Sequence, residues 1–194
     1  MKICFATNNP NKINEVRDFL EGSKYEIVSL AEVGCTEDIP ETSETIEGNS
    51  YEKAAYIFEN YNVPCFADDT GLEVEALDGE PGVKSARFAG DQRNADDNNE
   101  LLLRRLGGKI NRKGRFKTVI TWITKEGSKQ FTGIVNGEIL HHHSGVRGFG
   151  YDPLFRPDGY EQTFAEMTMR EKNQISHRAL ATKAFIEYLS NQKI

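Results

Sequence analysis

Two adjacent aspartates, Asp68 and Asp69, directly follow a short apolar run over residues 63–67. The run has the length and composition of a buried strand, so we expect the two carboxylates at the end of that strand. A buried carboxylate is costly unless a cation or hydrogen-bond donors accompany it, and ligands of α/β proteins often bind at strand ends. Thr70 and Gly71 come next, and Asp and Gly are also ordinary turn residues. Taken alone, the segment therefore predicts either a cation site or a solvated turn.

Another carboxylate, Glu41, and a lysine, Lys53, are further candidates for a site around Asp69. Glu41 lies in an acidic loop over residues 37–42, and together with Asp69 it would offer two hard oxygen ligands. Mg²⁺ is typically held by one or two carboxylates plus substrate phosphates. Lys53 lies in an expected helix over 49–61, where a lysine usually faces solvent, so its part in a site depends on the neighbouring motifs.

The polar segment over residues 7–12 joins an expected first strand, 2–6, to an expected helix that ends at Gly22. Backbone N–H groups and the positive end of the helix dipole favour a phosphate at such a junction, and Lys12 adds a full charge. The segment lacks the glycine spacing of a Walker motif. A plain capped helix start is the alternative interpretation.

Two later segments have residue types suited to a purine base. In 148–153, Phe149 and Tyr151 are separated by glycine and followed by Asp152, which suits ring stacking and polar contacts to a base edge. A bulged strand end with core aromatic residues is the alternative. In 170–178, Ser176 is a good helix N-cap, which places His177 and Arg178 in a first turn where the dipole disfavours cations. Their presence suggests a compensating anion or polar ligand.

Three consecutive histidines at 141–143 invite a metal interpretation. Adjacent residues of a strand point to opposite faces, so three in a row rarely bind one metal. We therefore expect an exposed strand end at this position.

The elements expected from periodicity alternate between strands and helices. We expect strands over 2–6, 25–30, 63–67, 72–77, 115–124, 129–135 and 138–141, and helices from about residue 13 and over 49–61, 94–106 and 176–190. Strand–helix units followed by an antiparallel hairpin indicate an α/β fold with a mixed sheet.

Composition excludes several classes of protein. The chain has 194 residues, 38% of them hydrophobic, and no apolar run near the roughly 20 residues that a membrane span requires. The N-terminus turns polar too early for a signal peptide. A net charge of −6 argues against a general nucleic-acid binder, and three widely spaced cysteines fit free thiols in a reducing cytosol.

Together the motifs closely resemble those of the inosine/xanthosine triphosphate pyrophosphatase family. The resemblance rests on residues 7–12, 41–42, 47–49, 53–54, 67–72, 81–87, 148–153 and 176–178, which occur in the order of the family. It implies one nucleoside-triphosphate pyrophosphatase domain over 1–194, with a long mixed sheet flanked by helices and two lobes around a central active-site cleft. It also implies Mg²⁺-dependent hydrolysis of ITP, dITP and XTP to the monophosphate and pyrophosphate, by a cytoplasmic homodimer without a stable nucleic-acid or membrane partner.

The resemblance also implies roles for individual residues. The triphosphate would be held by Thr7, Asn8, Asn9, Pro10, Asn11, Lys12 and Lys53. Glu41 and Asp69 would bind the metal, and Asp69 would also accept the proton. Thr70 would contact substrate, and the nucleoside site would comprise Phe149, Gly150, Tyr151, Asp152, Lys172, His177 and Arg178.

This chain departs from the commonest family pattern in three places. Asn8 and Asn11 stand where glycines are frequent, Thr70 replaces a frequent serine, and Ser43-Glu44 stands where a small or apolar pair is usual. Two other functions remain as alternatives: a pyrophosphatase for pyrimidine or other modified nucleotides, and a non-catalytic nucleotide- or RNA-binding module.

Overall fold

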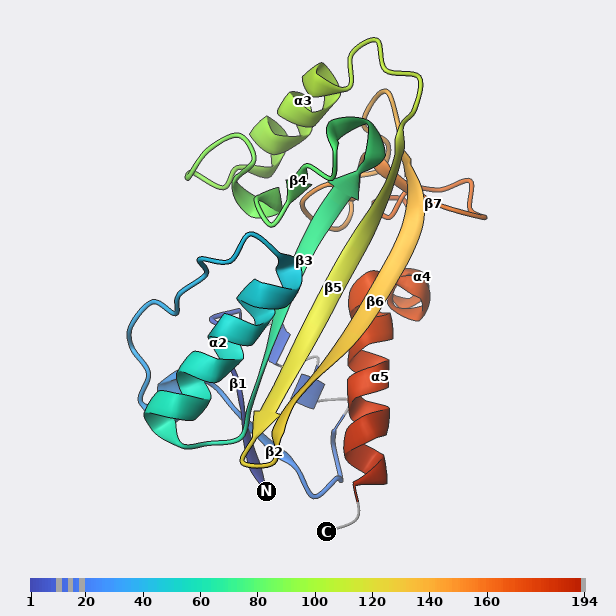
Figure 1. The fold of residues 1–194 in the computed structure, drawn as a ribbon. Helices are drawn as coiled ribbons and strands as arrows, with labels where there is room; N and C mark the ends of the chain where they lie inside the picture. Colours follow the sequence, from blue (N-terminus) through green and yellow to red (C-terminus); the bar gives the residue numbers. More distant parts are fainter. Residues whose placement is uncertain (10–11, 14–15, 18–19, 193–194) are drawn as a thin grey trace. The chain divides into compact units, whose positions relative to one another are not determined.

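The computed structural model describes residues 1–9, 12–13, 16–17 and 20–192 (Figure 1). The chain divides into two compact units. Unit 1 comprises Met1–Asp69, Val119–Thr132 and Ala181–Ile194, and unit 2 comprises Thr70–Thr118 and Gly133–Leu180. Each unit is built from segments that lie far apart in the sequence, and the boundary in the acidic motif falls between Asp69 and Thr70.

The strands form one seven-stranded mixed sheet. They are β1 (Lys2–Phe5), β2 (Glu26–Val28), β3 (Cys65–Val74), β4 (Pro81–Gly82), β5 (Lys113–Thr124), β6 (Gly127–Ile139) and β7 (Phe155–Pro157). The order is β2-β1-β3-β5-β6-β7, with β4 paired to β3. β1 is parallel to β2 and β3, whereas the β3–β4 and β6–β7 pairs are antiparallel. The expected α/β class, with a long mixed sheet flanked by helices, is confirmed.

In unit 1, alternation along the strands supplies two apolar faces. Phe5 and Phe66 pack with Phe185 of α5 (His177–Asn191), whereas their strand neighbours Cys4 and Ala67 pack with α2 (Ile46–Tyr61). Because successive strand residues point to opposite faces, α2 and α5 cover opposite sides of this part of the sheet. The described positions 12–13 and 16–17 are helical, as expected for the segment after residue 12.

In unit 2, one core joins the other helices to the strands. α3 (Ala95–Arg105) contributes Leu102, and Leu106 follows at its end, both fully buried against Leu72 and Val74 of β3. α4 (Met169–Ile175) begins at a Thr168–Glu171 capping box. Short 3₁₀ helices occupy Ala31–Val33, Glu75–Leu77 and Ser85–Arg87. No helix in the described part of the chain is long and apolar enough to span a membrane.

The largest correction concerns the acidic pair. Asp68 and Asp69 do not lie at a strand end, because β3 continues through them to Val74, where Glu75–Leu77 forms a 3₁₀ helix in place of the expected hairpin strand. The pair fits inside a strand because each carboxylate contacts a lysine ammonium, which partly offsets its desolvation. Turn propensity is thus overridden by partners that are distant in sequence.

Other boundaries also differ from the expectations. α2 begins three residues earlier than expected because the Thr45 side chain accepts a hydrogen bond from the Gly48 N–H and caps the helix. The strand expected at 138–141 is instead the end of β6, and α4 was not expected at all. In the last helix, Leu180 is 40% exposed and the neighbouring Ala181 is buried.

Candidate active site

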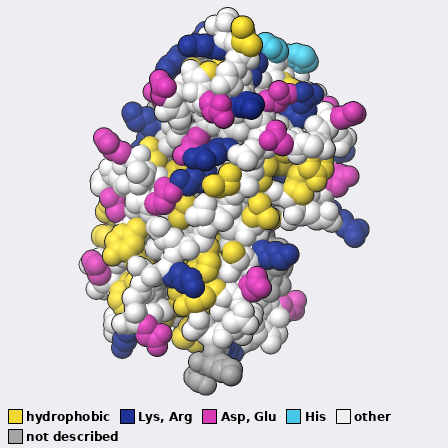
Figure 2. Space-filling view, turned by 45° about the vertical axis from the view of Figure 1, so that its right-hand side comes forward, with side chains coloured by type: hydrophobic (Ala, Val, Ile, Leu, Met, Phe, Trp, Pro, Cys, Tyr) yellow, Lys and Arg dark blue, Asp and Glu magenta, His cyan; other side chains and the backbone are white. Residues whose placement is uncertain are grey.

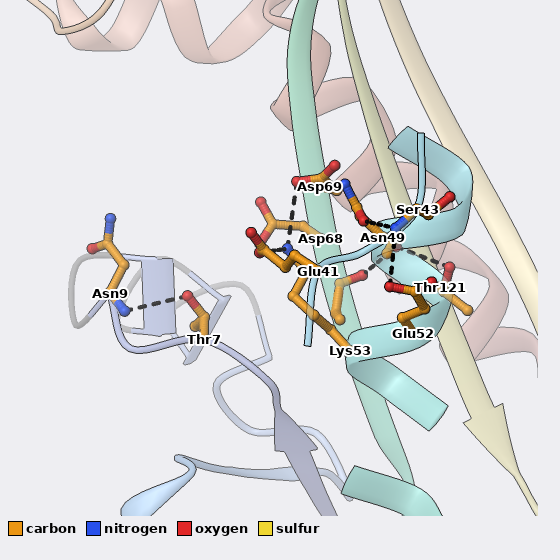
Figure 3. Close-up of polar contacts among 12 residues, drawn as sticks. Thr7, Asn9, Glu41, Ser43, Asn49, Glu52, Lys53, Asp68, Asp69 and Thr121 are labelled. Carbon is orange, nitrogen blue, oxygen red and sulfur yellow. Dashed lines mark hydrogen bonds and ion pairs between the residues drawn. The ribbon is translucent and has the colours of Figure 1, made fainter. Parts of the chain in front are cut away.

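Two carboxylates converge on one ammonium in unit 1 (Figure 3). Nζ of Lys53 lies 2.7 Å from Oε1 of Glu41 and 3.4 Å from Oδ1 of Asp69. Lys53 lies on the buried face of α2, Asp69 on β3, and Glu41 on the loop before α2. The three residues that were expected to bind metal and phosphate therefore meet through three different elements.

The electrostatic environment of Asp69 differs from that of an ordinary surface carboxylate. Burial raises the pKa of Asp69, and the lowering effect of Lys53 does not fully offset it. Oδ2 of Asp69 is buried, and no donor in the described part of the chain hydrogen-bonds to it. A buried carboxylate oxygen without a donor is suited to accept a cation or a water molecule.

Lys53 stays protonated in this environment. Burial alone would lower its pKa, but the negative charges of Asp69, Asp68 and Glu41 outweigh burial and raise the pKa. The ammonium therefore provides a permanent positive charge between two of the carboxylates.

Asp68 forms a separate ion pair. Nζ of Lys12 lies 2.9 Å from Oδ1 and 2.7 Å from Oδ2 of Asp68, which is 4% exposed. Asp68 and Asp69 are successive strand residues and so lie on opposite faces of β3. Each carboxylate therefore has its own lysine.

The segment before Lys12 is described only in part. The Asn9 N–H donates to Oγ1 of Thr7 at 3.2 Å (Figure 3), and the Lys12 N–H approaches Oδ1 of Asn9 at 3.4 Å. Asn9 thus has the contact of a helix N-cap, which is compatible with the capped helix start that the sequence left open. Asn8 is exposed. Pro10 and Asn11, also expected to hold phosphate, lie outside the described residues.

Buried polar residues support the unit 1 cluster, and sequence reasoning missed them. Oγ of Ser50 lies 2.9 Å from the Ala67 carbonyl and 2.8 Å from Oγ1 of Thr121. Nε2 of Gln130 donates to Thr121 and to the Glu47 carbonyl. These bonds join α2 to β3, β5 and β6 beside Asp69. No local pattern predicts them, because their partners are up to 83 residues apart.

In unit 2, the side chain of Asp152 bonds both to its own loop, 148–153, and to α4. It is 2% exposed, accepts the Phe149 N–H at 2.8 Å and forms an ion pair with Lys172 of α4. Nζ of Lys172 also lies 4.9 Å from the centre of the Phe149 ring, and the Arg178 guanidinium lies 5.6 Å from it. The Phe149 ring is 64% exposed, so an aromatic surface remains available beside two cations.

The two aromatic residues of this loop differ in environment. Tyr151 is 4% exposed and its hydroxyl donates to the Ser85 carbonyl at 2.9 Å. The alternative of a core aromatic residue is thus confirmed for Tyr151, whereas the Phe149 ring is exposed and its contact with a base stays a prediction. The Thr70 hydroxyl, expected to contact substrate, is hydrogen-bonded to the Thr118 hydroxyl at 2.8 Å.

The N-cap expected at Ser176 is confirmed at the start of α5. Oγ of Ser176 accepts the Ala179 N–H at 3.2 Å, as an N-cap does. His177 is 5% exposed and stacks on Phe116, with ring centres 4.6 Å apart. Arg178 reaches Phe149 as described above.

The structure thus brings several of the expected residues together in two clusters, one in each unit. The charged cluster of unit 1 is Lys12, Glu41, Lys53, Asp68 and Asp69. The aromatic-cationic cluster of unit 2 is Phe149, Asp152, Lys172, His177 and Arg178. Among the described residues, no group of three or more His, Cys, Asp or Glu side chains forms a metal site.

The three consecutive histidines follow the end of β6 at Ile139. His141, His142 and His143 are exposed, as expected, and histidine side chains reach the surface at one end of the face in Figure 2. On that face, lysine and arginine side chains are interspersed with aspartate and glutamate (Figure 2).

The model of the Ham1 family matches residues 3–188. A relative from Flavobacterium psychrophilum, named dITP/XTP pyrophosphatase, is 52% identical over 98% of this chain and 100% of its own length. A Bacillus subtilis relative of the same name is 43% identical over 95% of this chain and 94% of its own.

Solved structures agree. The Staphylococcus aureus Ham1 protein matches with a TM-score of 0.95 and 36% identity, covering 100% of both chains. A structure titled nucleoside-triphosphatase / dITP/XTP pyrophosphatase, from Mycobacterium abscessus, matches with a TM-score of 0.85 and 39% identity, over 96% of this chain and 99% of its own. Sequence and fold agree over nearly the whole length, and the chain belongs to the Ham1 family.

Proposed function

We propose that this protein hydrolyses deaminated purine nucleoside triphosphates (ITP, dITP and XTP) to the monophosphate and pyrophosphate. Such an activity would keep these nucleotides out of DNA and RNA. The names of the full-length relatives support this reaction. The observation that carries it in this chain is the convergence of Glu41 and Asp69 on Lys53, with one buried Asp69 oxygen lacking a donor among the described residues.

The charged cluster of unit 1 suits phosphate chemistry with Mg²⁺ as cofactor. Hydrolysis at the α-phosphorus needs a water molecule, a proton acceptor and positive charge for the pyrophosphate that leaves. Asp69 orients the water and accepts its proton, while Lys53 and Lys12 bind phosphate oxygens. Glu41 and the free oxygen of Asp69 are hard donors that fit Mg²⁺, which when bound neutralises phosphate charge.

The aromatic-cationic cluster of unit 2 suits recognition of the base. The exposed Phe149 ring stacks on the purine, and a donor from His177 or Arg178 pairs with the 6-oxo group. Adenine presents a 6-amino donor at that position, which leaves the protein donor unpaired. Such a mismatch separates substrates by orders of magnitude.

Measurement of pyrophosphate released from ITP, with and without Mg²⁺, tests the proposal. We expect Mg²⁺-dependent release from ITP, dITP and XTP, and at least about 100-fold lower kcat/KM for ATP. Faster release from pyrimidine or methylated nucleotides would favour a different pyrophosphatase. Binding without any release would indicate a non-catalytic module.

We further infer a homodimer in a reducing, cytoplasmic compartment. The family resemblance implies the dimer, and three buried free cysteines support the compartment. Light scattering on the purified protein tests the dimer, and a measured mass equal to the 21.9 kDa of one chain would contradict it.

A further inference from the structure

The loop that carries Phe149 and Asp152 has no regular secondary structure of its own. Residues 148–154 are bends and turns, and Gly148 and Gly150 have φ angles of +77° and +62°. A Cβ on Gly148 would lie only 2.1 Å from Oδ2 of Asp152. The loop therefore follows a path that glycine permits, and other groups must select that path from the many that glycine allows.

One such group is Asn99, which is not among the site residues that the sequence or the family resemblance predicts. Asn99 is 1% exposed on the inner face of α3, and its Nδ2 donates to the Gly150 carbonyl at 2.9 Å. A buried amide on a helix is costly unless it is hydrogen-bonded. Its Oδ1 is buried and has no donor in the described part of the chain. The bond to the Gly150 carbonyl is therefore the hydrogen bond that offsets the burial of this amide.

The neighbouring amide on the same helix serves another segment. Nδ2 of Asn98 donates to the Ala86 carbonyl at 3.1 Å, and its Oδ1 accepts the Ala89 N–H at 2.7 Å. Only Asn99 of this pair reaches the loop directly. The two amides thus divide the inner face of α3 between two backbone segments.

A second tether reaches the loop from the other side of Gly150. The Tyr151 hydroxyl donates to the Ser85 carbonyl, and Oγ of Ser85 accepts the Leu72 N–H of β3 at 2.8 Å. Ser85 also donates to the Gly82 carbonyl at 2.6 Å. Residues 150 and 151 are therefore fixed to α3 and, through Ser85, to β3, all within unit 2.

We propose that Asn99 is a positioning residue for recognition of the purine base, acting through the Gly150 carbonyl on Phe149, with Tyr151 and Ser85 as the second tether. This inference rests on the proposed function. Asn99 contacts no substrate. It restricts the loop to the path in which the Asp152 carboxylate accepts the Phe149 N–H and the Phe149 ring lies beside Lys172 and Arg178.

The test replaces Asn99 with aspartate, which has the same shape but, when ionised, no donor for the Gly150 carbonyl. Losing one buried hydrogen bond corresponds to a roughly tenfold effect. We expect the KM for ITP to rise about tenfold, while kcat and the inhibition constant of inorganic tripolyphosphate stay within about twofold. Tyr151→Phe, which keeps the buried ring, is the second variant and should raise the KM in the same direction.

A matched control separates positioning from loss of helix stability. Asn94→Ala removes the N-cap of the same helix, where Oδ1 of Asn94 accepts the N–H groups of Asp96 and Asp97. It should lower the melting temperature without raising the KM for ITP. In a Phe149→Ala background, Asn99→Asp should add less than about twofold to the KM, because it acts through that ring.

Two results would overturn the inference: Asn99→Asp behaving like Asn94→Ala, or its effect on KM persisting unchanged without Phe149. Calorimetric binding of inosine monophosphate to the same variants requires no turnover. A wild-type protein that binds the monophosphate but releases no pyrophosphate from ITP would therefore count against the proposed function alone. Absence of monophosphate binding by the wild-type protein would overturn the positioning role.

Discussion

The two clusters of candidate residues are held in place by different physical means. In unit 1, Asp68, Asp69 and Lys53 project from a strand and a helix, and opposite charges contact one another directly. In unit 2, Phe149 and Asp152 lie on an irregular loop whose path depends on hydrogen bonds between side chains and backbone. The first cluster rests mainly on charge compensation, whereas the second combines one buried ion pair, Asp152–Lys172, with backbone tethers.

This difference suits the two tasks that the proposed reaction sets. A triphosphate brings concentrated negative charge, so its site needs rigid positive and negative groups that are already in place. A purine brings a flat ring whose edge must be read, so its site depends on the position of one aromatic surface. Substitutions in unit 1 should therefore change turnover and stability, and substitutions in unit 2 should change KM and substrate choice.

The largest expected effect comes from Asp69→Asn. The amide keeps the shape but cannot accept the proton of the attacking water, so we expect turnover of ITP to fall at least about 1,000-fold with the fold intact. Steady-state pyrophosphate release, with circular dichroism for the fold, measures it. Asp68→Asn removes the neighbouring carboxylate on the opposite face and should stay at least about ten times more active than Asp69→Asn. Equal losses in the two variants would contradict the assignment of the proton-acceptor role to Asp69 rather than Asp68.

The next effect is on stability and tests charge compensation in unit 1. Lys53→Met keeps the apolar stem but leaves Glu41 and Asp69 without their shared cation. Breaking a buried pair costs about 3–5 kcal/mol, and because Glu41 is partly exposed we expect about 2 kcal/mol by chemical denaturation. Millimolar Mg²⁺ should stabilise this variant more than the wild-type protein, because the cation offsets the same two carboxylates.

Lys183→Met, at an exposed position of α5, is the matched control and should change neither stability nor its dependence on Mg²⁺. If Mg²⁺ stabilised wild-type protein and Lys53→Met equally, the two carboxylates would not be the shared site of lysine and metal.

A third prediction isolates the base site. Phe149→Ala should raise the KM for ITP about 10- to 100-fold, the range for loss of one base-stacking contact. The inhibition constant of inorganic tripolyphosphate, which has no base, should stay within about twofold. Val146→Ala changes another exposed apolar residue nearby in sequence, 99% exposed, and should leave both constants unchanged. Equal changes in the two constants for Phe149→Ala would argue against base stacking.

The comparison also explains what the sequence alone could predict. The sequence indicated that Asp69, Lys53 and Glu41 belong together, and the three residues do lie in contact. It placed the two aspartates at a strand end, however, and they lie inside β3. Asp and Gly favour turns locally. The two aspartates are nevertheless stable inside β3 because Lys12 and Lys53, which are distant in sequence, pair with them. Local propensity does not include the ion pairs with distant lysines that make these buried carboxylates stable in a strand.

In unit 2 the sequence left two interpretations of the 148–153 motif open. The core-aromatic interpretation is confirmed for Tyr151, and base binding at Phe149 stays a prediction. Tyr151 packs in the core of unit 2 and its hydroxyl donates to the Ser85 carbonyl, whereas Phe149 is exposed, and these differences arise from tertiary structure. α4 was missed although a signal was present. Thr168 and Glu171 have the spacing of a capping box, which marks a helix start.

The smallest expected effect concerns how the loop before Glu41 is held, and it depends on pH. The Glu37 carboxylate accepts hydrogen bonds from the hydroxyls of Tyr61 at 2.6 Å and Tyr56 at 3.1 Å, both on α2. The Tyr61 bond is the main cause that lowers the pKa of Glu37 from the ordinary 4.5 to about 2. The unfolded chain therefore binds the proton more readily than the folded one. The stabilising contribution of Glu37 is full above about pH 4.5 and is lost as the pH falls towards about 2.

Glu37→Gln removes this titration, so its denaturation midpoint should fall less between about pH 6 and pH 3 than that of the wild-type protein. Glu59→Gln, an exposed glutamate on α2, should follow the wild-type curve. Parallel curves for Glu37→Gln and wild type would mean that the tyrosine contacts do not persist in solution. The loop of unit 1 would then be held by the Glu41–Lys53 pair and the bonds of Glu52 to Thr42 and Ser43. Charge compensation would in that case extend from the phosphate site to the loop that carries Glu41.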